Sequence, residues 1–226
     1  MKWGGSVGYS PLKAPTTACG YTDEFDDASL SGSWTEWDQA AYLTVSETTL
    51  GLEITAASNA TLKLGGIFKD APASPYSITT LVGLYANQAT DIVRAGILLG
   101  QSLGGSPSTS NELVWGYDRG INLVRLQSHL DYQTGSSTDI SVSFAGASEL
   151  HSGIYLRVRL ASNILRLDYS WDGIGYIAAG SQTAPWTPSN IGLHMDIRNP
   201  SPAKAFFPFF RVTSSACVLD IPGGGR

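Results

Sequence analysis

Aromatic residues next to polar ones, close to a tight turn, are the first candidates for chemistry in this sequence. Trp171 and Asp172 precede a glycine, and Tyr176 and Trp186 follow shortly after. Aromatic faces stack on sugar rings, and carboxylates accept hydrogen bonds from sugar hydroxyls. We therefore predict a carbohydrate-binding cluster of Trp171, Asp172, Tyr176 and Trp186, since a tryptophan at a hairpin tip has little core to enter. The alternative is that these rings pack in the core or at its rim.

Acidic residues gather near the start of the chain, where Asp23, Asp26 and Asp27 lie within five residues. Carboxylates are hard oxygen ligands that suit calcium, so these three aspartates form a candidate calcium site. Their spacing matches no known loop such as the EF-hand, and the alternative is an ordinary solvated turn. Apart from calcium, we expect no cofactor.

Other metal or nucleophilic chemistry has little support in the sequence. The cysteines, Cys19 and Cys217, form no CxxC pair, and the histidines, His129, His151 and His194, lie far apart along the chain. A zinc or haem site is therefore not expected. The chain also lacks the Gly-x-Ser-x-Gly sequence of a serine nucleophile elbow.

The composition excludes several classes of protein. The net charge is −5 and charged residues make up 15% of the chain, so no basic surface for nucleic acid is expected. No apolar run approaches the roughly 18 residues of a membrane span, so we expect no membrane insertion. The first residues lack the apolar stretch of a secretory signal. Hydrophobic residues reach 42% and aromatic residues 10%, enough to bury a substantial core.

Apolar and polar residues alternate with a period of two along most of the chain, as in strands with one buried face. In residues 155–160, Leu156, Val158 and Leu160 alternate with polar or aromatic positions, and Asp172-Gly173 marks a later tight turn. Further runs of this kind lie at residues 50–55, 60–68, 76–84, 93–100, 112–117, 121–127, 140–144, 165–170, 191–198 and 205–212. A dozen or so short strands without helical windows predict an all-β fold of two packed antiparallel sheets.

The two ends of the chain show no such period. We expect one domain over residues 21–213, an irregular N-terminal arm over 1–20 and a C-terminal tail over 214–226. Arms of this kind bury little surface alone, so we expect them to mediate a homo-oligomer. The four phenylalanines of residues 206–210 agree with this, because alternation sends two of them outward, to be covered by the N-terminal arm or by another subunit. Pro208 suits an edge or bulged strand.

Taken in chain order, several motifs match a known pattern. The acidic opening is followed by Leu30, Trp34 and Trp37, and later by Tyr-Ser-Trp-Asp-Gly at residues 169–173. Over about residues 21–213 the chain resembles the concanavalin A-like lectin/glucanase jelly roll, particularly the modules of bacteriophage tail and virion proteins. The resemblance implies a non-enzymatic virion structural or adhesion protein of the tail or capsid surface. It would be made in the host cytoplasm, become extracellular with the virion, and contact other virion proteins and a cell-surface glycan.

The resemblance carries two further expectations. The first and last strands of this fold are antiparallel neighbours, and pairing Phe25 with Arg211 would bring Cys19 near Cys217, allowing a disulfide; the alternative is two unrelated thiols. Hydrolytic members carry Glu-x-Asp-x-Glu on one strand, and its absence here favours a protein that is not an enzyme. The alternatives are a secreted polysaccharide-active enzyme, its carbohydrate-binding domain, or a bacterial surface lectin.

Overall fold

The computed structural model describes residues 20–38, 42–86, 92–103, 111–120, 123–130, 138–144, 153–199 and 201–214. Cys19, Cys217 and almost all of the two predicted arms lie outside the described residues, so the disulfide stays a prediction. Strands are the regular elements of the described part of the chain, and no helix there is long and apolar enough to cross a membrane. The predicted all-β fold is confirmed.

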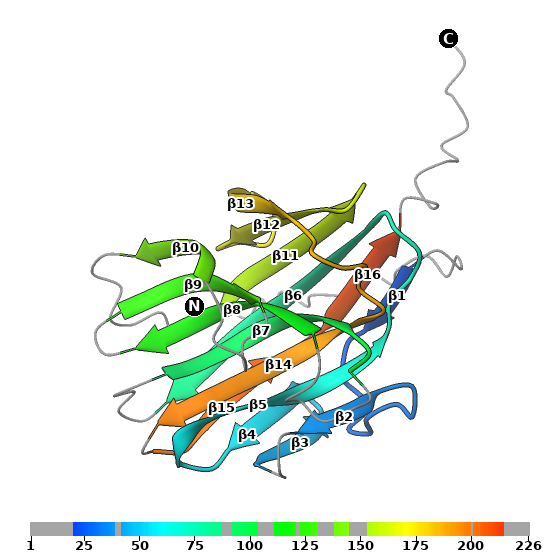
Figure 1. Cartoon of the computed structure of the whole chain (residues 1–226). Coiled ribbons are helices and arrows are strands. Elements are labelled where there is room, and N and C mark those ends of the chain that lie inside the picture. Colours follow the sequence, from blue (N-terminus) through cyan, green and yellow to red (C-terminus); the bar gives the residue numbers. More distant parts are fainter. Residues whose placement is uncertain are drawn as a thin grey trace, which may run out of the picture.

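Two antiparallel sheets lie face to face, with the seven-stranded sheet in front in Figure 1. The nine-stranded sheet contains, in spatial order, β13 (Ile177–Thr183), β12 (Ile164–Ser170), β11 (Ile154–Ala161), β6 (Tyr76–Ala86), β15 (Ala203–Phe207), β4 (Gly51–Ala56) and β3 (Leu43–Thr48), while β16 (Phe210–Ser214) also pairs with β6 and β1 (Gly20–Asp23) pairs with β16. The seven-stranded sheet contains β10 (Thr138–Phe144), β9 (Leu123–Leu130), β8 (Asn111–Gly120), β7 (Ile92–Gln101), β14 (Asn190–Asn199), β5 (Asn59–Asp70) and β2 (Thr35–Asp38).

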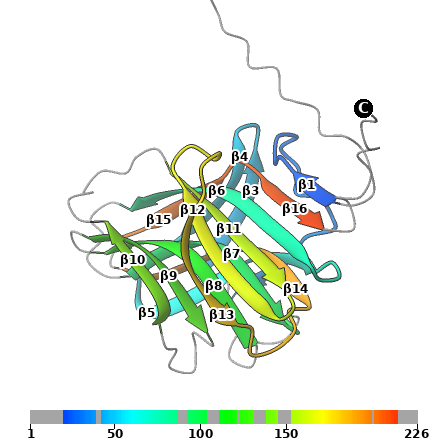
Figure 2. The same cartoon turned by 90° about the horizontal axis from the view of Figure 1, so that it is seen from above.

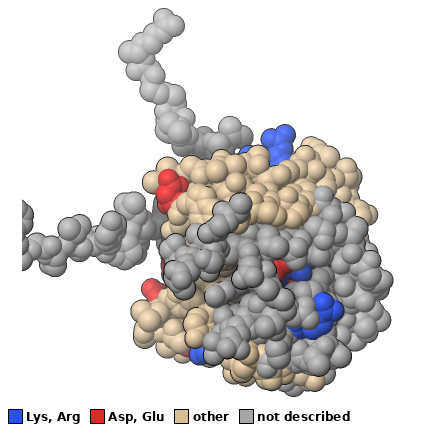
Figure 3. Space-filling model, turned by 90° about the vertical axis from the view of Figure 1, so that its left-hand side faces the viewer, with Lys and Arg blue, Asp and Glu red and all other residues tan. Residues whose placement is uncertain are grey.

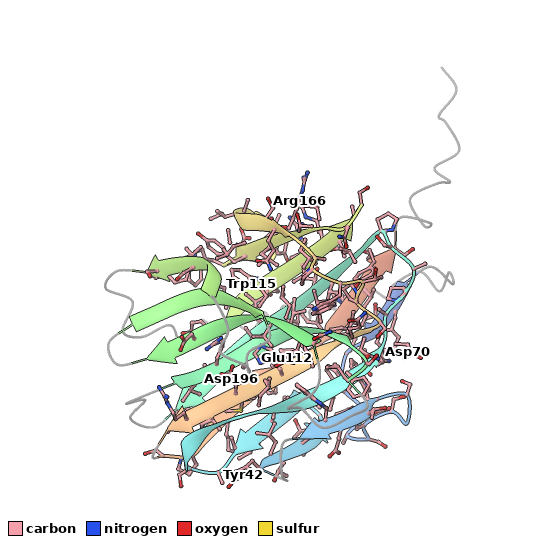
Figure 4. All side chains as sticks on the ribbon, in the orientation of Figure 1. Tyr42, Asp70, Glu112, Trp115, Arg166 and Asp196 are labelled. Carbon is pink, nitrogen blue, oxygen red and sulfur yellow. The ribbon has the colours of Figure 1, made fainter. Side chains whose placement is uncertain are left out.

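The core lies between the two sheets and is built from the inward side chains of both. In β11, Leu156, Val158 and Leu160 are buried, and the residues between them are half-buried. Trp115 of β8 lies in the centre of the sandwich (Figure 4) with no exposed surface, and its Nε1 donates to the backbone oxygen of Asp168 in β12 at 3.2 Å. Burial of each such side chain stabilises the fold by about 1.5–3 kcal/mol. The hydrogen bond also joins the centre of one sheet to the other.

The central strands of the seven-stranded sheet, β7, β8 and β14, are buried on both faces. In β7, Ile97 and Leu99 belong to the core between the sheets, whereas Leu98 packs on the opposite face with Val114 and Trp37. A strand covered on both sides reads as a continuous apolar run rather than as strict alternation. The outward side chains of β6 and β11, in contrast, are half-buried or exposed, so the nine-stranded sheet presents an open face.

The first and last described strands are neighbours, as predicted, but in a different register. β1 runs antiparallel to β16 (Figure 2), with Thr22 opposite Arg211, so the predicted pairing of Phe25 with Arg211 is wrong by three residues. The strand ends earlier because Asp23 Oδ1 accepts a hydrogen bond from the Phe25 backbone N at 3.0 Å, and Phe25 turns into the core with φ 46°. The register argument for a Cys19–Cys217 pair therefore loses its basis.

The predicted strand over residues 205–212 is two strands, β15 and β16, which follow the same edge of β6 one after the other. The interruption falls at Pro208, which has no N–H to donate. Thr80 Oγ1 donates to the Phe209 carbonyl at 2.7 Å at this break. Two phenylalanines face the core, Phe207 and Phe210, and two face outward, Phe206 and Phe209, so the predicted number is right. Unbroken alternation would have put Phe207 and Phe209 on the same face, and the break at Pro208 shifts the alternation by one residue.

Candidate functional site

Trp171 and Asp172 occupy the turn between β12 and β13. Trp171 is 43% exposed, and its ring packs edge-on against Phe144 of β10, with centroids 5.1 Å apart. Asp172 Oδ1 accepts hydrogen bonds from the backbone N of Ile174 at 2.8 Å and of Gly175 at 2.9 Å. These bonds hold the pKa of Asp172 below its usual value. The carboxylate is therefore engaged in shaping the turn, while the indole stays available at its tip.

The other two residues of the predicted cluster lie apart from Trp171. Trp186 is half-buried and packs against the core between the sheets. Tyr176 stacks with Arg157, whose Cζ lies 3.9 Å from the ring centroid. Among the described residues, the rings in contact with Trp171 are those of Phe144 and Tyr169, not those of Tyr176 or Trp186. Trp186 and Tyr176 therefore do not form one cluster with Trp171, and the observed neighbour of Tyr176 is Arg157.

Tyr176 belongs to a larger group on the outer side of the nine-stranded sheet, which we name the tyrosine–arginine face: Tyr155, Arg157, Tyr176, Phe209 and Arg211. Arg211 Cζ lies 4.3 Å from the Phe209 ring centroid, and the Phe209 and Tyr155 centroids are 6.2 Å apart. Tyr155 and Arg157 point outward because the alternate residues of β11 fill the core. Burial raises the pKa of the Tyr176 hydroxyl, against the opposing charge of Arg157. The hydroxyl is thus a neutral hydrogen-bonding group at physiological pH.

Gly173 lets the turn approach this face. Its φ is +75°, and a Cβ added there would lie 2.9 Å from the Tyr155 ring. Glycine adopts this backbone region without the steric cost that other residues meet. The hairpin tip that carries Trp171 is therefore held against Tyr155, at the border of the tyrosine–arginine face.

Asp168 fixes two arginines on the same side of the sheet. Its Oδ2 accepts from Arg157 Nε at 3.0 Å and from Arg159 Nε at 2.9 Å, and its Oδ1 accepts from Arg159 Nη2 at 3.0 Å. Asp168 is 2% exposed, whereas the two arginines remain 26% and 40% exposed. A buried carboxylate that holds two partly exposed guanidinium groups leaves their other N–H donors in fixed positions for a ligand.

The acidic opening does not converge on a metal site. Asp23 Oδ2 accepts from the Tyr21 hydroxyl at 2.8 Å and from Trp34 Nε1 at 2.7 Å. Asp27 Oδ1 accepts a backbone N–H of its own turn, and Asp26 is exposed. In the described part of the chain, no group of three or more His, Cys, Asp or Glu side chains is placed to hold a metal ion. The predicted calcium site is not formed by these aspartates, because hydrogen-bond donors of the protein already occupy Asp23.

A second polar group lies on the seven-stranded sheet, on the face away from the core. Strand register places Asp196 of β14 (Figure 4) opposite Arg94 of β7, and Arg94 opposite Asp118 of β8. Arg94 Nε lies 3.8 Å from Asp196 Oδ2, and His194, also fully buried, precedes Asp196 on the same face. Burial raises the pKa of Asp196 to about 7; Arg94 opposes this shift and Asp118 adds to it. This row of two carboxyl groups and one arginine can hold a proton near neutral pH.

Comparisons with known proteins address the fold. No protein-family model matches the chain, and no curated protein matches it in sequence. The GH43 protein BlXynB of Bacillus licheniformis superposes with a TM-score of 0.62 at 14% identity, over 85% of this chain and 39% of that chain. The VIP36 exoplasmic/lumenal domain in its Ca²⁺/Man3GlcNAc-bound form gives 0.56 at 10% identity, over 80% of this chain and 84% of that one. A legume lectin-like domain from Entamoeba histolytica gives 0.53 at 10% identity, over 80% and 90%.

This chain has a lectin-like jelly-roll fold. It spans well under half of the BlXynB chain. The sequence patterns did not predict two features of this jelly roll. One is the Asp168 carboxylate, which Arg157 and Arg159 share, and the other is the Asp196–Arg94–Asp118 row. The available signal was a charged residue between apolar neighbours, such as Asp168 between Leu167 and Tyr169. Only the strand register reveals which charges then meet.

Proposed function

We propose that this chain is a non-enzymatic, glycan-binding adhesion module of a bacteriophage virion, located on the tail or on the capsid surface. The tyrosine–arginine face carries the proposal, because it combines partly exposed rings with fixed N–H donors on a rigid sheet. Sugar rings stack on aromatic faces, and sugar hydroxyls exchange hydrogen bonds with such side chains. Trp171 at the adjoining hairpin tip extends the contact area.

Two lines of reasoning support separate parts of this proposal. The VIP36 domain, which has the same fold, is described in a Man3GlcNAc-bound form, and this supports a glycan as ligand. The virion location rests on the resemblance of residues 23–37 to phage modules. That resemblance also predicts contacts with other virion proteins, and the two arms predict a homo-oligomer.

The glycan ligand is tested on an array of bacterial surface glycans with the wild type and Tyr176→Ala. We expect Tyr176→Ala to lower the affinity about tenfold or more, because a central aromatic contact and the support of Arg157 are lost together. Tyr85→Ala is the matched control, since Tyr85 is 63% exposed on β6, beyond the tyrosine–arginine face. Thermal unfolding of both variants separates lost binding from lost folding. Unchanged binding by Tyr176→Ala, or a wild type that binds no glycan, contradicts the proposal.

The virion location is tested separately, with an antibody against the purified chain. Immunogold labelling of intact phage particles is the expected result, together with oligomers in negative-stain images of the purified protein. Labelling of the bacterial cell wall in the absence of phage would favour a bacterial surface lectin instead.

A polysaccharide-active enzyme is the second candidate, and the Asp196–Arg94–Asp118 row favours it. Glycoside hydrolysis uses one protonated and one ionised carboxyl group, and burial raises the pKa of Asp196 beside Asp118. Both side chains are fully buried, so this candidate requires a rearrangement that exposes them to substrate. Reducing-sugar release from laminarin or agar, lost in both Asp196→Asn and Asp118→Asn, would establish this function. No release between pH 5 and 8 would agree with a non-enzymatic module.

A further inference from the structure

Three arginines and one aspartate crowd the outer face of β11 and β12. The register places Arg157 opposite Asp168, and Arg159 opposite Arg166. Like charges directly opposite one another in a sheet are destabilising. The arginine triad, Arg157, Arg159 and Arg166, thus has one carboxylate for three guanidinium groups, although the whole chain carries a net charge of −5. On the side seen in Figure 3, the charged side chains of the described residues are few and mixed in sign.

Arg166 is the member of the triad that Asp168 does not neutralise. Both oxygens of Asp168 already accept N–H donors from Arg157 and Arg159. Arg166 is exposed and projects away from the sandwich (Figure 4), and no ion pair joins it to an acidic side chain of the described residues. Two like charges that face each other, as Arg159 and Arg166 do, break the pairing rules that the rest of this strand pair follows, and such exceptions are typical of binding sites.

A pocket opens beside the triad, where β6, β11 and β16 adjoin. Its volume is about 250 Å³, and Arg159 lines it together with Ser77, Thr213 and Ser214. Drug-sized ligands occupy sites of about 300–1,000 Å³, so this pocket suits a smaller group, such as one sugar residue of a longer chain. The pocket wall is mainly apolar, with Pro75, Tyr76, Leu160 and Ala161, and suits the apolar face of a sugar ring. Ser77, Thr213 and Arg159, whose side chain is 40% exposed, supply polar groups.

We propose that the arginine triad and this pocket bind a carboxylate-bearing sugar residue of an acidic polysaccharide; this inference rests on the glycan-binding function proposed above. Guanidinium groups bind carboxylates through two parallel N–H···O bonds. Asp168 already holds Arg157 and Arg159 in place, so little side-chain freedom is lost when the ligand binds. The acidic sugar supplies a carboxylate for Arg166, the guanidinium group that Asp168 does not neutralise, while Arg159, whose Nε and Nη2 already donate to Asp168, contributes its remaining N–H donors.

The test compares acidic polymers with their own neutral forms. Binding of the full chain to polygalacturonate, hyaluronan and polysialate is measured by affinity electrophoresis against the carboxyl-reduced form of each polymer. We expect at least one acidic polymer to bind about tenfold more tightly than its reduced form, with a difference that shrinks in high salt. Arg166→Gln, at an exposed position, should lose about tenfold in affinity for the acidic polymer and keep its affinity for the reduced one.

Lys204→Gln is the matched control, because it also removes one positive charge from an exposed position on the same sheet, although Lys204 is paired with Glu53. It should bind both polymer forms as the wild type does. Equal binding of acidic and reduced polymers, or binding of array glycans without any of the three acidic polymers, contradicts the acidic-sugar inference and leaves the glycan-binding function standing. Binding of no glycan at all contradicts both. An equal loss in Lys204→Gln, or equal binding of duplex DNA, identifies a non-specific charge effect and also overturns the inference.

Discussion

At Asp196, a carboxyl group lies where ionisation is costly. It is fully buried, and its contact with Arg94 at 3.8 Å is too long for a hydrogen bond. Burial therefore outweighs the arginine, and the pKa is raised to about 7. A group whose pKa is higher in the folded than in the unfolded state stabilises the fold below its unfolded pKa. For Asp196 this stabilisation is lost as the pH rises from about 4 to about 7.

Asp196→Asn removes this pH dependence, because an amide does not ionise. We expect the wild type to lose stability relative to the variant between pH 4 and 7, by on the order of 4 kcal/mol over the whole range, with no further change above pH 8. Urea denaturation at a series of pH values measures the difference. A difference that stays constant from pH 4 to 8 would show that Asp196 ionises freely in the folded protein.

Among the elements, the β12–β13 hairpin depends on Gly173. Gly173→Ala is expected to cost about 1–2 kcal/mol, because alanine is disfavoured at φ +75° and its Cβ would meet the Tyr155 ring. Gly175→Ala is the control, since the nearest atoms to its added Cβ are the Asp172 carboxylate oxygens at 3.9 Å, and it should stay within about 0.5 kcal/mol of the wild type. Thermal or chemical unfolding compares the two. Equal stability of the two variants would rule out this role of Gly173.

Some elements were readable from the sequence because one of their faces is open. β11 alternates clearly, since its outward residues remain partly solvated. β12 alternates because its outward residues, Arg166, Asp168 and Ser170, are polar, although the last two are buried. β2 was missed because four residues are too few to display a period. The break between β15 and β16 depends on Pro208 and on the hydrogen bond from the Thr80 hydroxyl to the Phe209 carbonyl. Alternation does not detect these features, and it therefore predicted one continuous strand.

The candidate site was predictable only in part. The Asp172-Gly173 pair identified a turn, and this placed Trp171 at an exposed tip. Trp186 packs instead against the core. The sequence did not predict this, because nothing near Trp186 distinguishes a position at the rim of the core from one in a loop. The role of Asp168 follows from its position opposite Arg157, a relation between two strands that no single-strand pattern contains.

On the scale of the whole molecule, β16 contributes side chains both to the core between the two sheets and to the proposed binding surface. Val212 points into the core and is 3% exposed, whereas Thr213 is exposed and lines the pocket. Val212→Asp should cost more than about 3 kcal/mol, because it buries an unpaired charge. Thr213→Asp should remain folded and weaken binding of acidic polymers by adding a like charge. Circular dichroism and affinity electrophoresis test the pair; a Thr213→Asp variant with full affinity would exclude the pocket.

The Trp115–Asp168 hydrogen bond gives the interior a means of altering the surface. Trp115 holds the backbone of the same residue whose carboxylate orients Arg157 and Arg159. A substitution deep between the layers can therefore displace both guanidinium groups without touching any ligand. In the proposed glycan-binding function, ligand preference therefore depends on core packing as well as on direct contacts, and substitutions in the core can change it.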